Sequence, residues 1–182
     1  MNTSMHNNNL IVHDPVVMHN FSIIEKERDN DFYPENNSGA FILLVCPSTG
    51  KILLGKRHSE SDYQPNKWFC FGGHCEDDET PLQTAIREVD EECEIGNDSY
   101  EIVENPAYVH KNDDKNGIEH TIYVYLASTK NEITPHINFE HSDAKWFTIN
   151  DLIDLNLFDT MNSMFTDDAF IKKIKRILNK DI

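Results

Sequence analysis

The sequence GHCEDDETPLQTAIREVDEE, residues 73–92, decides the fold because it joins a glycine turn to the start of a helix. In TPLQ, residues 80–83, Thr80 fits the N-cap, Pro81 fits the first helical position, and Gln83 can reach back to the cap. Apolar residues then recur at helical spacing, at Leu82, Ala85, Ile86, Val89 and Cys93. The pattern predicts a helix that packs on the core along one face.

Three carboxylates crowd another face of this helix. Glu88, Glu91 and Glu92 are spaced three and four residues apart, which makes them neighbours on a helix surface. Like charges in such positions repel, so a purely structural helix gains nothing from them. A divalent cation such as Mg²⁺ reverses the repulsion, because it binds carboxylate and phosphate oxygens. The alternative, a solvated acidic helix after a glycine turn, explains neither Arg87 nor the glycines.

The segment resembles the signature of the Nudix hydrolases. That signature is Gly, five residues, Glu, seven residues, then Arg-Glu-U-x-Glu-Glu-x-Gly-U, where U is a bulky aliphatic residue. The positions that agree here are Gly73, Glu79, Arg87, Glu88, Val89, Glu91, Glu92 and Ile95. The match is specific, because eight constrained positions fall in register, and the resemblance extends over residues 39–180.

Two positions depart from the family pattern. Glu94 stands where the signature has glycine, and Gly96 follows two residues later. Because glutamate is disfavoured in the left-handed conformation that often ends a helix, we expect the helix to continue until Gly96. Phe71 replaces the proline of the common Trp-x-x-Pro-Gly-Gly lead-in, whose other positions are kept. Neither change removes a charged residue.

The resemblance implies a role for each charged position. Glu88, Glu91 and Glu92 would be the metal carboxylates, and Glu88 or Glu91 would also act in catalysis. The carbonyl of Gly73 would bind a metal ion, and Glu76 would be an outer ligand. The cofactor would be Mg²⁺, with Mn²⁺ as an alternative.

Arg87 would hold the helix carboxylates through a bidentate ion pair with Glu79. We also expect mutual repulsion to raise the pKa of at least one of the clustered glutamates in the absence of metal.

The general base lies outside the signature in some family members. The outside candidates in this chain are Glu119, Glu140, Asp113 and Asp114. We prefer Glu140, because it precedes Trp146 in a segment that resembles the Glu-x-x-x-x-x-Trp pattern of the family. Each of the four has a simpler alternative as a solvated surface charge.

Basic and aromatic residues just upstream of the glycine turn are the candidate substrate contacts. Lys56 and Arg57 could meet phosphate oxygens, and Trp68 belongs to the lead-in. The alternative for the basic residues is a role in solubility at a strand edge.

Composition limits the function classes. The chain has 182 residues, of which 38% are hydrophobic, and this is ordinary for a globular domain with a core. It lacks an apolar run of about 18 residues and a recognisable signal peptide, so we expect no membrane span and a cytoplasmic location. The net charge of −16 disfavours nucleic-acid binding. It leaves polyphosphate substrates open, because bound cations change the local sign of the charge.

The remaining pattern predicts an α/β fold with a mixed sheet between helices, which the resemblance identifies as a Nudix-type α/β/α sandwich. Strands are expected at residues 39–45, 51–55, 68–71, 100–110, 119–128 and 144–147, and further helices at 149–155 and 167–180. Residues 39–182 would form this domain. Residues 1–38 would form an N-terminal arm that is either partly disordered or adds a strand.

The resemblance implies Mg²⁺-dependent hydrolysis of a diphosphate bond in a nucleoside diphosphate derivative. Candidate substrates are a nucleotide sugar such as ADP-ribose, a dinucleoside polyphosphate and a modified nucleoside triphosphate. Two alternatives stay open: an inactive nucleotide-binding or regulatory module, and an RNA 5′-cap hydrolase, which the acidity disfavours. The sequence also leaves open a homodimer.

Overall fold

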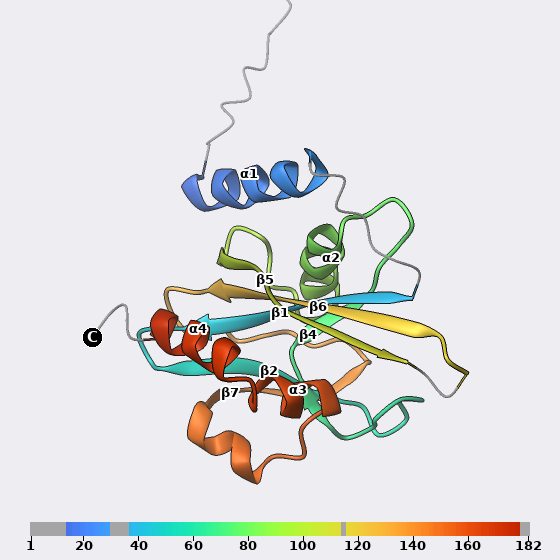
Figure 1. The fold of residues 1–182 in the computed structure, drawn as a ribbon. Helices are drawn as coiled ribbons and strands as arrows, with labels where there is room; N and C mark the ends of the chain where they lie inside the picture. The colour runs from blue at the N-terminus through green and yellow to red at the C-terminus, as the bar shows by residue number, and fades with distance from the viewer. Residues whose placement is uncertain (1–13, 30–36, 114–115, 179–182) are drawn as a thin grey trace, which may run out of the picture.

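The computed structural model describes residues 14–29, 37–113 and 116–178. It contains a seven-stranded sheet with helices on both faces (Figure 1), which confirms the predicted mixed α/β sandwich. The strands are β1 (Ser38–Cys46), β2 (Lys51–Arg57), β3 (Trp68–Phe69), β4 (Phe71–His74), β5 (Glu101–Asp113), β6 (Glu119–Ser128) and β7 (His141–Thr148). The helices are α1 (Pro15–Asp29), α2 (Pro81–Cys93), the 3-10 helix η1 (Ile149–Asp154), α3 (Asp159–Met164) and α4 (Asp168–Leu178).

Strand β1 lies at the centre of the sheet and organises the others. It pairs in parallel with β6, while its first half pairs antiparallel with β4 and its last two residues pair antiparallel with β2. In the β4 register, Ala40 lies opposite Gly73 and Phe41 lies opposite Gly72. The glycine turn is thereby held against the middle of the sheet, directly before the chain enters α2.

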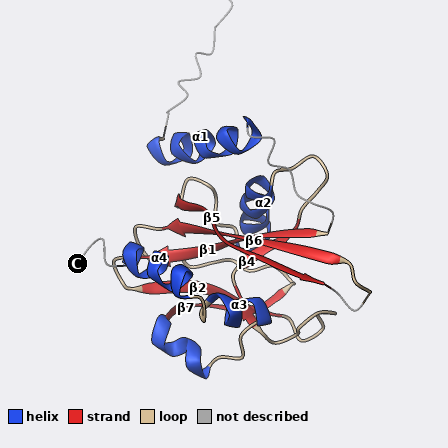
Figure 2. Cartoon of the chain, in the orientation of Figure 1, coloured by secondary structure: helices blue, strands red, loops and turns tan. Residues whose placement is uncertain are grey.

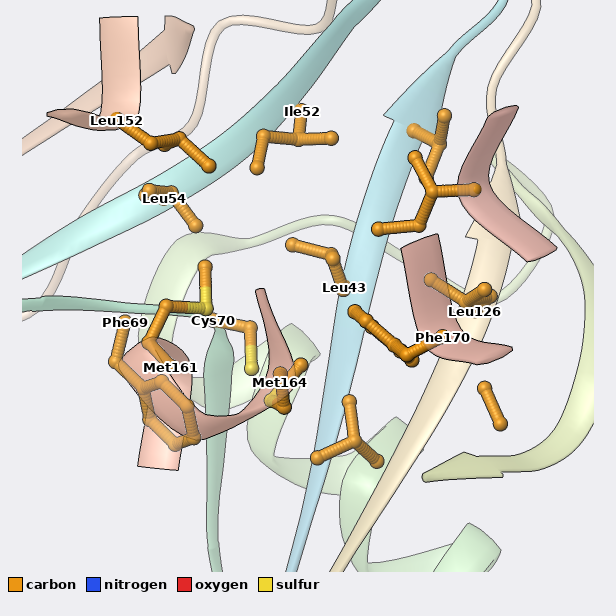
Figure 3. Close-up of a cluster of buried hydrophobic side chains, with 14 of the residues drawn as sticks. Leu43, Ile52, Leu54, Phe69, Cys70, Leu126, Leu152, Met161, Met164 and Phe170 are labelled. Atoms are coloured by element: carbon orange, nitrogen blue, oxygen red, sulfur yellow. The ribbon is translucent and has the colours of Figure 1, made fainter. Parts of the chain in front are cut away.

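Two apolar clusters form the core, and Figure 2 shows helices on both sides of the sheet. One cluster lies under α3 and α4 and includes Leu43, Leu126, Met164 and Phe170 (Figure 3). The other lies under α2. There the predicted stripe is confirmed, because its residues Leu82, Ala85, Val89 and Cys93 are fully buried while Ile86 is partly buried.

Both ends of α2 are closed by specific contacts, and the predicted capping box is present. The Gln83 N–H donates to Thr80 Oγ1 at 3.3 Å, and the Thr80 N–H donates to Gln83 Oε1 at 2.9 Å. The prediction that the helix continues to Gly96 is wrong. It ends at Cys93, and Glu94 adopts the left-handed conformation with φ 52° and donates its N–H to the Asp90 carbonyl at 2.9 Å.

Tertiary contacts explain this early exit. Ile95 follows at 2% exposure, so the chain must turn at Glu94 to bring that side chain into the core. Burial of an isoleucine contributes roughly 1.5–3 kcal/mol. A left-handed non-glycine residue costs about 1–2 kcal/mol, so burial of Ile95 can offset the strain.

The described part of the N-terminal arm is a helix and not the added strand that was one of the two alternatives. Residues 15–29 form helix α1, which lies over the face that carries α2 (Figure 1). The sequence analysis missed this helix because its apolar residues are weakly patterned and its two fully or nearly fully buried side chains, Asn20 and Glu27, are polar. Residues 1–13 and 30–36 lie outside the described residues, so the domain boundary between residues 38 and 39 stays a prediction.

Among the helices in the described ranges, none combines the length and apolarity that a membrane crossing requires. The cytoplasmic location stays a prediction.

The strained exit of α2 gives a stability prediction. We expect Glu94→Gly to raise the free energy of unfolding by about 1 kcal/mol, because glycine adopts the left-handed conformation without the steric cost. The surface contact of Glu94 with His136 is mostly exposed, at 69% and 74% for the two side chains, so its loss costs little. The measurement is chemical denaturation.

Glu94→Ala is the matched control for that experiment. It removes the same contact with His136 but keeps the Cβ atom, so we expect it to be no more stable than wild type. A glycine variant that is no more stable than the alanine variant would contradict the explanation.

Candidate active site

Two glutamate side chains from the second half of α2 contact the backbone of the glycine turn. The Gly72 N–H donates to Glu92 Oε2 at 2.8 Å. A Cβ atom at Gly73 would lie only 2.4 Å from Glu88 Oε1. The Glu88 carboxylate can therefore lie directly against β4 only because residue 73 is a glycine, while Glu92 is held there by a backbone N–H.

Arg87 binds three carboxylates at once. Its Nε and Nη2 donate to Glu79 Oε1 and Oε2 at 2.9 and 3.0 Å, which is the bidentate pair expected from the sequence. Its Nη1 donates to Glu88 at 2.9 Å and to Glu91 at 3.2 Å. The hydrogen bonds from Arg87 to Glu79 hold the pKa of Glu79 below its usual value. Glu76, the predicted outer ligand, is 3.9 Å from Nη2 and mostly exposed.

Burial is the main influence on the pKa values of Glu88 and Glu92. Glu92 is 4% exposed, and burial raises its pKa to about 8, although the Gly72 hydrogen bond opposes that shift. Burial also raises the pKa of Glu88. Repulsion between Glu88 and Glu92 adds to the shift of Glu92. The expectation of a raised pKa thus holds in direction, but burial rather than repulsion is its first cause.

The loop before β7 brings Glu140 to the same place. The Asn138 N–H donates to the Glu92 carbonyl at 2.9 Å, and the His58 N–H donates to the Glu140 carbonyl at 2.8 Å. Beyond the effect of burial, the negative charge of Glu140 raises the pKa of both Glu88 and Glu92. Glu140 therefore lies within electrostatic reach of the helix carboxylates.

The other candidate bases are placed differently. Glu119 forms an exposed ion pair with Lys111 at 3.0 Å on the β5–β6 hairpin, where it lies opposite Asp113. Asp114 lies outside the described residues.

The structure pairs Lys56 with Trp68 but does not bring all three candidate substrate contacts together. The positive charge of Arg57 lowers the pKa of Glu92, against the larger effect of burial. Arg57 therefore lies near the carboxylates. Lys56 lies in the sheet opposite Trp68 and Asp143. Trp68 is 8% exposed, makes an edge contact with Phe147 at 4.9 Å, and belongs to the cluster on the α4 face. This placement does not support a direct contact between Trp68 and a substrate at α2.

His141 is a residue of this region that the sequence analysis did not select. Its ring packs on Phe71 at 4.9 Å, and its Nδ1 is buried without a hydrogen-bond partner among the described residues. Burial, with help from the Arg57 charge, lowers its pKa to about 4, so the ring is neutral. The one signal in the sequence was its position next to Glu140, because a single histidine has no spacing pattern.

The donors fit a hard divalent cation in chemical type but do not converge as they stand. Mg²⁺ prefers oxygen ligands, which Glu88, Glu91, Glu92 and the Gly73 carbonyl supply. Within the part of the chain that the structure describes, no three acidic, histidine or cysteine side chains form a group that could hold an ion. Each of these carboxylates already has a protein partner, since Arg87 Nη1 donates to Glu88 Oε1 and Glu91 Oε2 and the Gly72 N–H donates to Glu92 Oε2.

Comparison with known proteins gives one family. The family model for the NUDIX domain matches residues 36–167, which is well over half of the chain. Dihydroneopterin triphosphate diphosphatase of Haemophilus influenzae is 28% identical over 113 residues, which are 62% of this chain. The match spans only 61% of that relative's length.

Solved structures show the same fold. The Ap4A hydrolase of C. elegans in a binary complex has a TM-score of 0.62 and 24% identity, and the match covers 78% of this chain and 96% of the other. The dihydroneopterin triphosphate pyrophosphohydrolase of E. coli also has a TM-score of 0.62, with 17% identity and coverage of 79% and 99%. At these identities the likeness concerns the fold.

The contact between Gly73 and Glu88 predicts a selective effect on metal binding. In Gly73→Ala the new methyl group displaces the Glu88 carboxylate, which can rotate away, so we expect the fold to be retained. We expect affinity for Mn²⁺, measured by calorimetry, to fall about 10- to 100-fold, as is common when the support of a metal ligand is lost.

Gly72→Ala provides the contrast. Its Cβ atom would lie 2.2 Å from the Ala40 carbonyl oxygen, which is backbone and cannot rotate away, so this variant should lose stability instead. Wild-type Mn²⁺ affinity in a folded Gly73→Ala protein would contradict the assigned role of Glu88.

The raised pKa of Glu92 predicts a pH-dependent stability of the metal-free protein. Between the ordinary value of 4.5 and the folded value of about 8, the folded state holds a proton that the unfolded chain has released. This stabilising contribution is complete below the unfolded pKa and is lost as pH rises through the folded pKa. The metal-free wild type should therefore lose stability from about pH 5 to pH 8.

Glu92→Gln cannot titrate, so its melting temperature should fall less over that range, with about 2–4 °C of difference for each kcal/mol. At pH 8 the variant should melt above the metal-free wild type. Parallel pH profiles of the two proteins would show that Glu92 titrates normally.

Proposed function

The chain belongs to the NUDIX domain family, and we propose that it is a hydrolase that cleaves a diphosphate bond in a nucleoside diphosphate derivative with Mg²⁺ as cofactor. The observation that carries this proposal is the shared position of Glu88, Glu92 and the glycine turn. There, two largely buried carboxylates lie against the backbone of the turn: Glu92 accepts the Gly72 N–H, and Glu88 packs on Gly73. A solvated acidic face would not bury them.

The chemistry follows from the charge of the substrate. A diphosphate resists attack by water because its own oxygens repel the nucleophile, and bound Mg²⁺ would neutralise and orient those oxygens. Glu88, Glu91, Glu92 and the Gly73 carbonyl would hold the ion, with Glu76 further out. Arg87 Nη1 keeps Glu88 and Glu91 in place, and a bound ion would compete with it for their oxygens.

Residues outside α2 complete the proposal. Glu140 carries an exposed carboxylate near Glu88 and Glu92, so it can accept the proton of the attacking water. Arg57 supplies positive charge on the same side, where it would attract the phosphates. Each position is reached from a different element, the loop before β7 and the end of β2.

We infer a small substrate with a triphosphate or longer phosphate chain. Support comes from the names of two relatives, a dihydroneopterin triphosphate diphosphatase and an Ap4A hydrolase. A net charge of −16 argues against a long RNA, whose binding normally needs a basic surface. ADP-ribose and capped RNA are therefore the less favoured substrates.

The test is a hydrolysis panel with Mg²⁺ or Mn²⁺ and products identified by mass. It contains dihydroneopterin triphosphate, Ap4A, a modified nucleoside triphosphate, ADP-ribose and a capped RNA. We expect turnover of a triphosphate or polyphosphate that stops with a chelator. Glu140→Gln should lower kcat about 10²–10⁴-fold, which is typical for loss of a general base.

Glu119→Gln is the matched control, because it removes an exposed glutamate that is paired with Lys111 on the β5–β6 hairpin. It should retain wild-type turnover. Tight binding of one compound without hydrolysis of any would instead favour the inactive binding module. Hydrolysis of capped RNA alone would favour the decapping alternative.

A further inference from the structure

A buried carboxylate from the N-terminal arm reaches the first turn of α2. Glu27 lies on α1 and is 4% exposed. Its Oε2 accepts the Leu82 N–H at 3.1 Å, and its Oε1 accepts the Tyr125 hydroxyl at 2.8 Å. The Thr80 side chain also hydrogen-bonds to it. Glu27 therefore satisfies a backbone N–H that the helix itself leaves without a partner.

This turn is connected to the carboxylate cluster through side chains. Glu79 directly precedes the cap Thr80, and its carboxylate accepts the Thr84 hydroxyl at 2.9 Å as well as both arms of the Arg87 fork. Arg87 in turn holds Glu88 and Glu91. The orientation of the first turn thus sets where Glu79 lies, and Glu79 sets where Arg87 holds its other partners.

A second contact fixes α1 beyond the other end of α2. Asn20 is fully buried, and its Nδ2 donates to the Tyr100 carbonyl at 2.8 Å and to Asn97 Oδ1 at 2.7 Å. Its Oδ1 accepts the Ile102 N–H at 3.0 Å. Because Asn97 follows the exit of α2 and Glu27 binds its entry, α1 is tied to both ends of that helix.

The chemistry of the contact argues for a specific role. A buried carboxylate costs free energy unless its oxygens are well bound, so an apolar residue would be the simpler way to pack α1 on the domain. Glu27 also lies before residues 36–167, the part of the chain that the family model covers. Its contact with α2 is therefore an addition of this chain's arm to the domain.

We propose that Glu27 is a positioning residue for the metal-binding face of α2. It acts by accepting the Leu82 N–H and so holding the first turn, from which Glu79 and Arg87 orient Glu88 and Glu91. The inference rests on the proposed hydrolase function.

The test measures Mn²⁺ affinity from the spin-resonance signal of free Mn²⁺, together with kcat and KM, in the full chain. We expect Glu27→Ala to raise the Kd for Mn²⁺ and to lower kcat, each about tenfold or more, because small displacements of reacting groups have such effects. The KM at saturating metal should change little. Glu27→Gln should keep the Kd for Mn²⁺ and kcat close to the wild-type values. Its amide oxygen can accept the Leu82 N–H while its amide N–H₂ donates to the Tyr125 hydroxyl.

Two control variants separate positioning from stability. Glu25→Gln changes an exposed glutamate on the same helix and should behave as wild type. Tyr125→Phe removes a different hydrogen-bond partner of Glu27, the one that does not belong to α2, and should lower the melting temperature without changing Mn²⁺ affinity. Glu27→Asp, which shortens the reach by one methylene, replaces Glu27→Ala if the latter does not fold, and an intermediate loss is expected.

Three results would overturn the proposal. A destabilised Glu27→Ala or Glu27→Asp with wild-type Mn²⁺ affinity and kcat would make Glu27 a structural contact only. A Glu27→Gln variant as impaired as Glu27→Ala would rule out the hydrogen-bond mechanism. A wild-type protein that binds no Mn²⁺ would refute both the proposed function and the role of Glu27. A wild-type protein that binds Mn²⁺ but hydrolyses nothing would refute the proposed function alone, because the Mn²⁺ titrations would still decide the role of Glu27.

Discussion

One guanidinium group stabilises the acidic face of α2. Arg87 is the residue that makes an arrangement of Glu79, Glu88 and Glu91 tolerable in a folded protein, because its fork satisfies one carboxylate fully and its remaining nitrogen shares the other two. Removing that group would leave partly buried like charges facing one another, which costs more than the loss of any one ion pair. The helix can therefore hold its acidic residues in place before any cation arrives.

The same arrangement makes metal binding an exchange. A cation that takes Glu88 Oε1 and Glu91 Oε2 would displace Arg87 Nη1, and one that takes Glu92 Oε2 would compete with the Gly72 N–H. The net affinity is then a difference between two sets of charge-assisted contacts. A monovalent ion offers too little charge to replace a guanidinium, whereas a divalent ion can repay the exchange. Selectivity for divalent cations would follow from the resident arginine as much as from the glutamates.

The sequence predicted those parts of the fold that depend on short-range signals. The capping box, the apolar stripe of α2 and the Arg87–Glu79 pair all involve residues within a few turns of one another. What it missed depends on distant contacts. Burial of Trp68 on the α4 face, the helix around Asn20 and the unpartnered His141 each follow from packing against residues far along the chain. A single sequence contains no local pattern for such contacts.

The early end of α2 shows how one helix terminus can control the composition of a site. In a helix that continued to Gly96, the carbonyl of Glu92 would accept the N–H of residue 96. Because the helix stops at Cys93, that carbonyl and the next are left to accept the N–H groups of Asn138 and His136. The loop is thereby bonded alongside the helix end, and Glu140 is brought to the carboxylates. One added turn of helix would thus separate Glu140 from its neighbours without changing any charged residue.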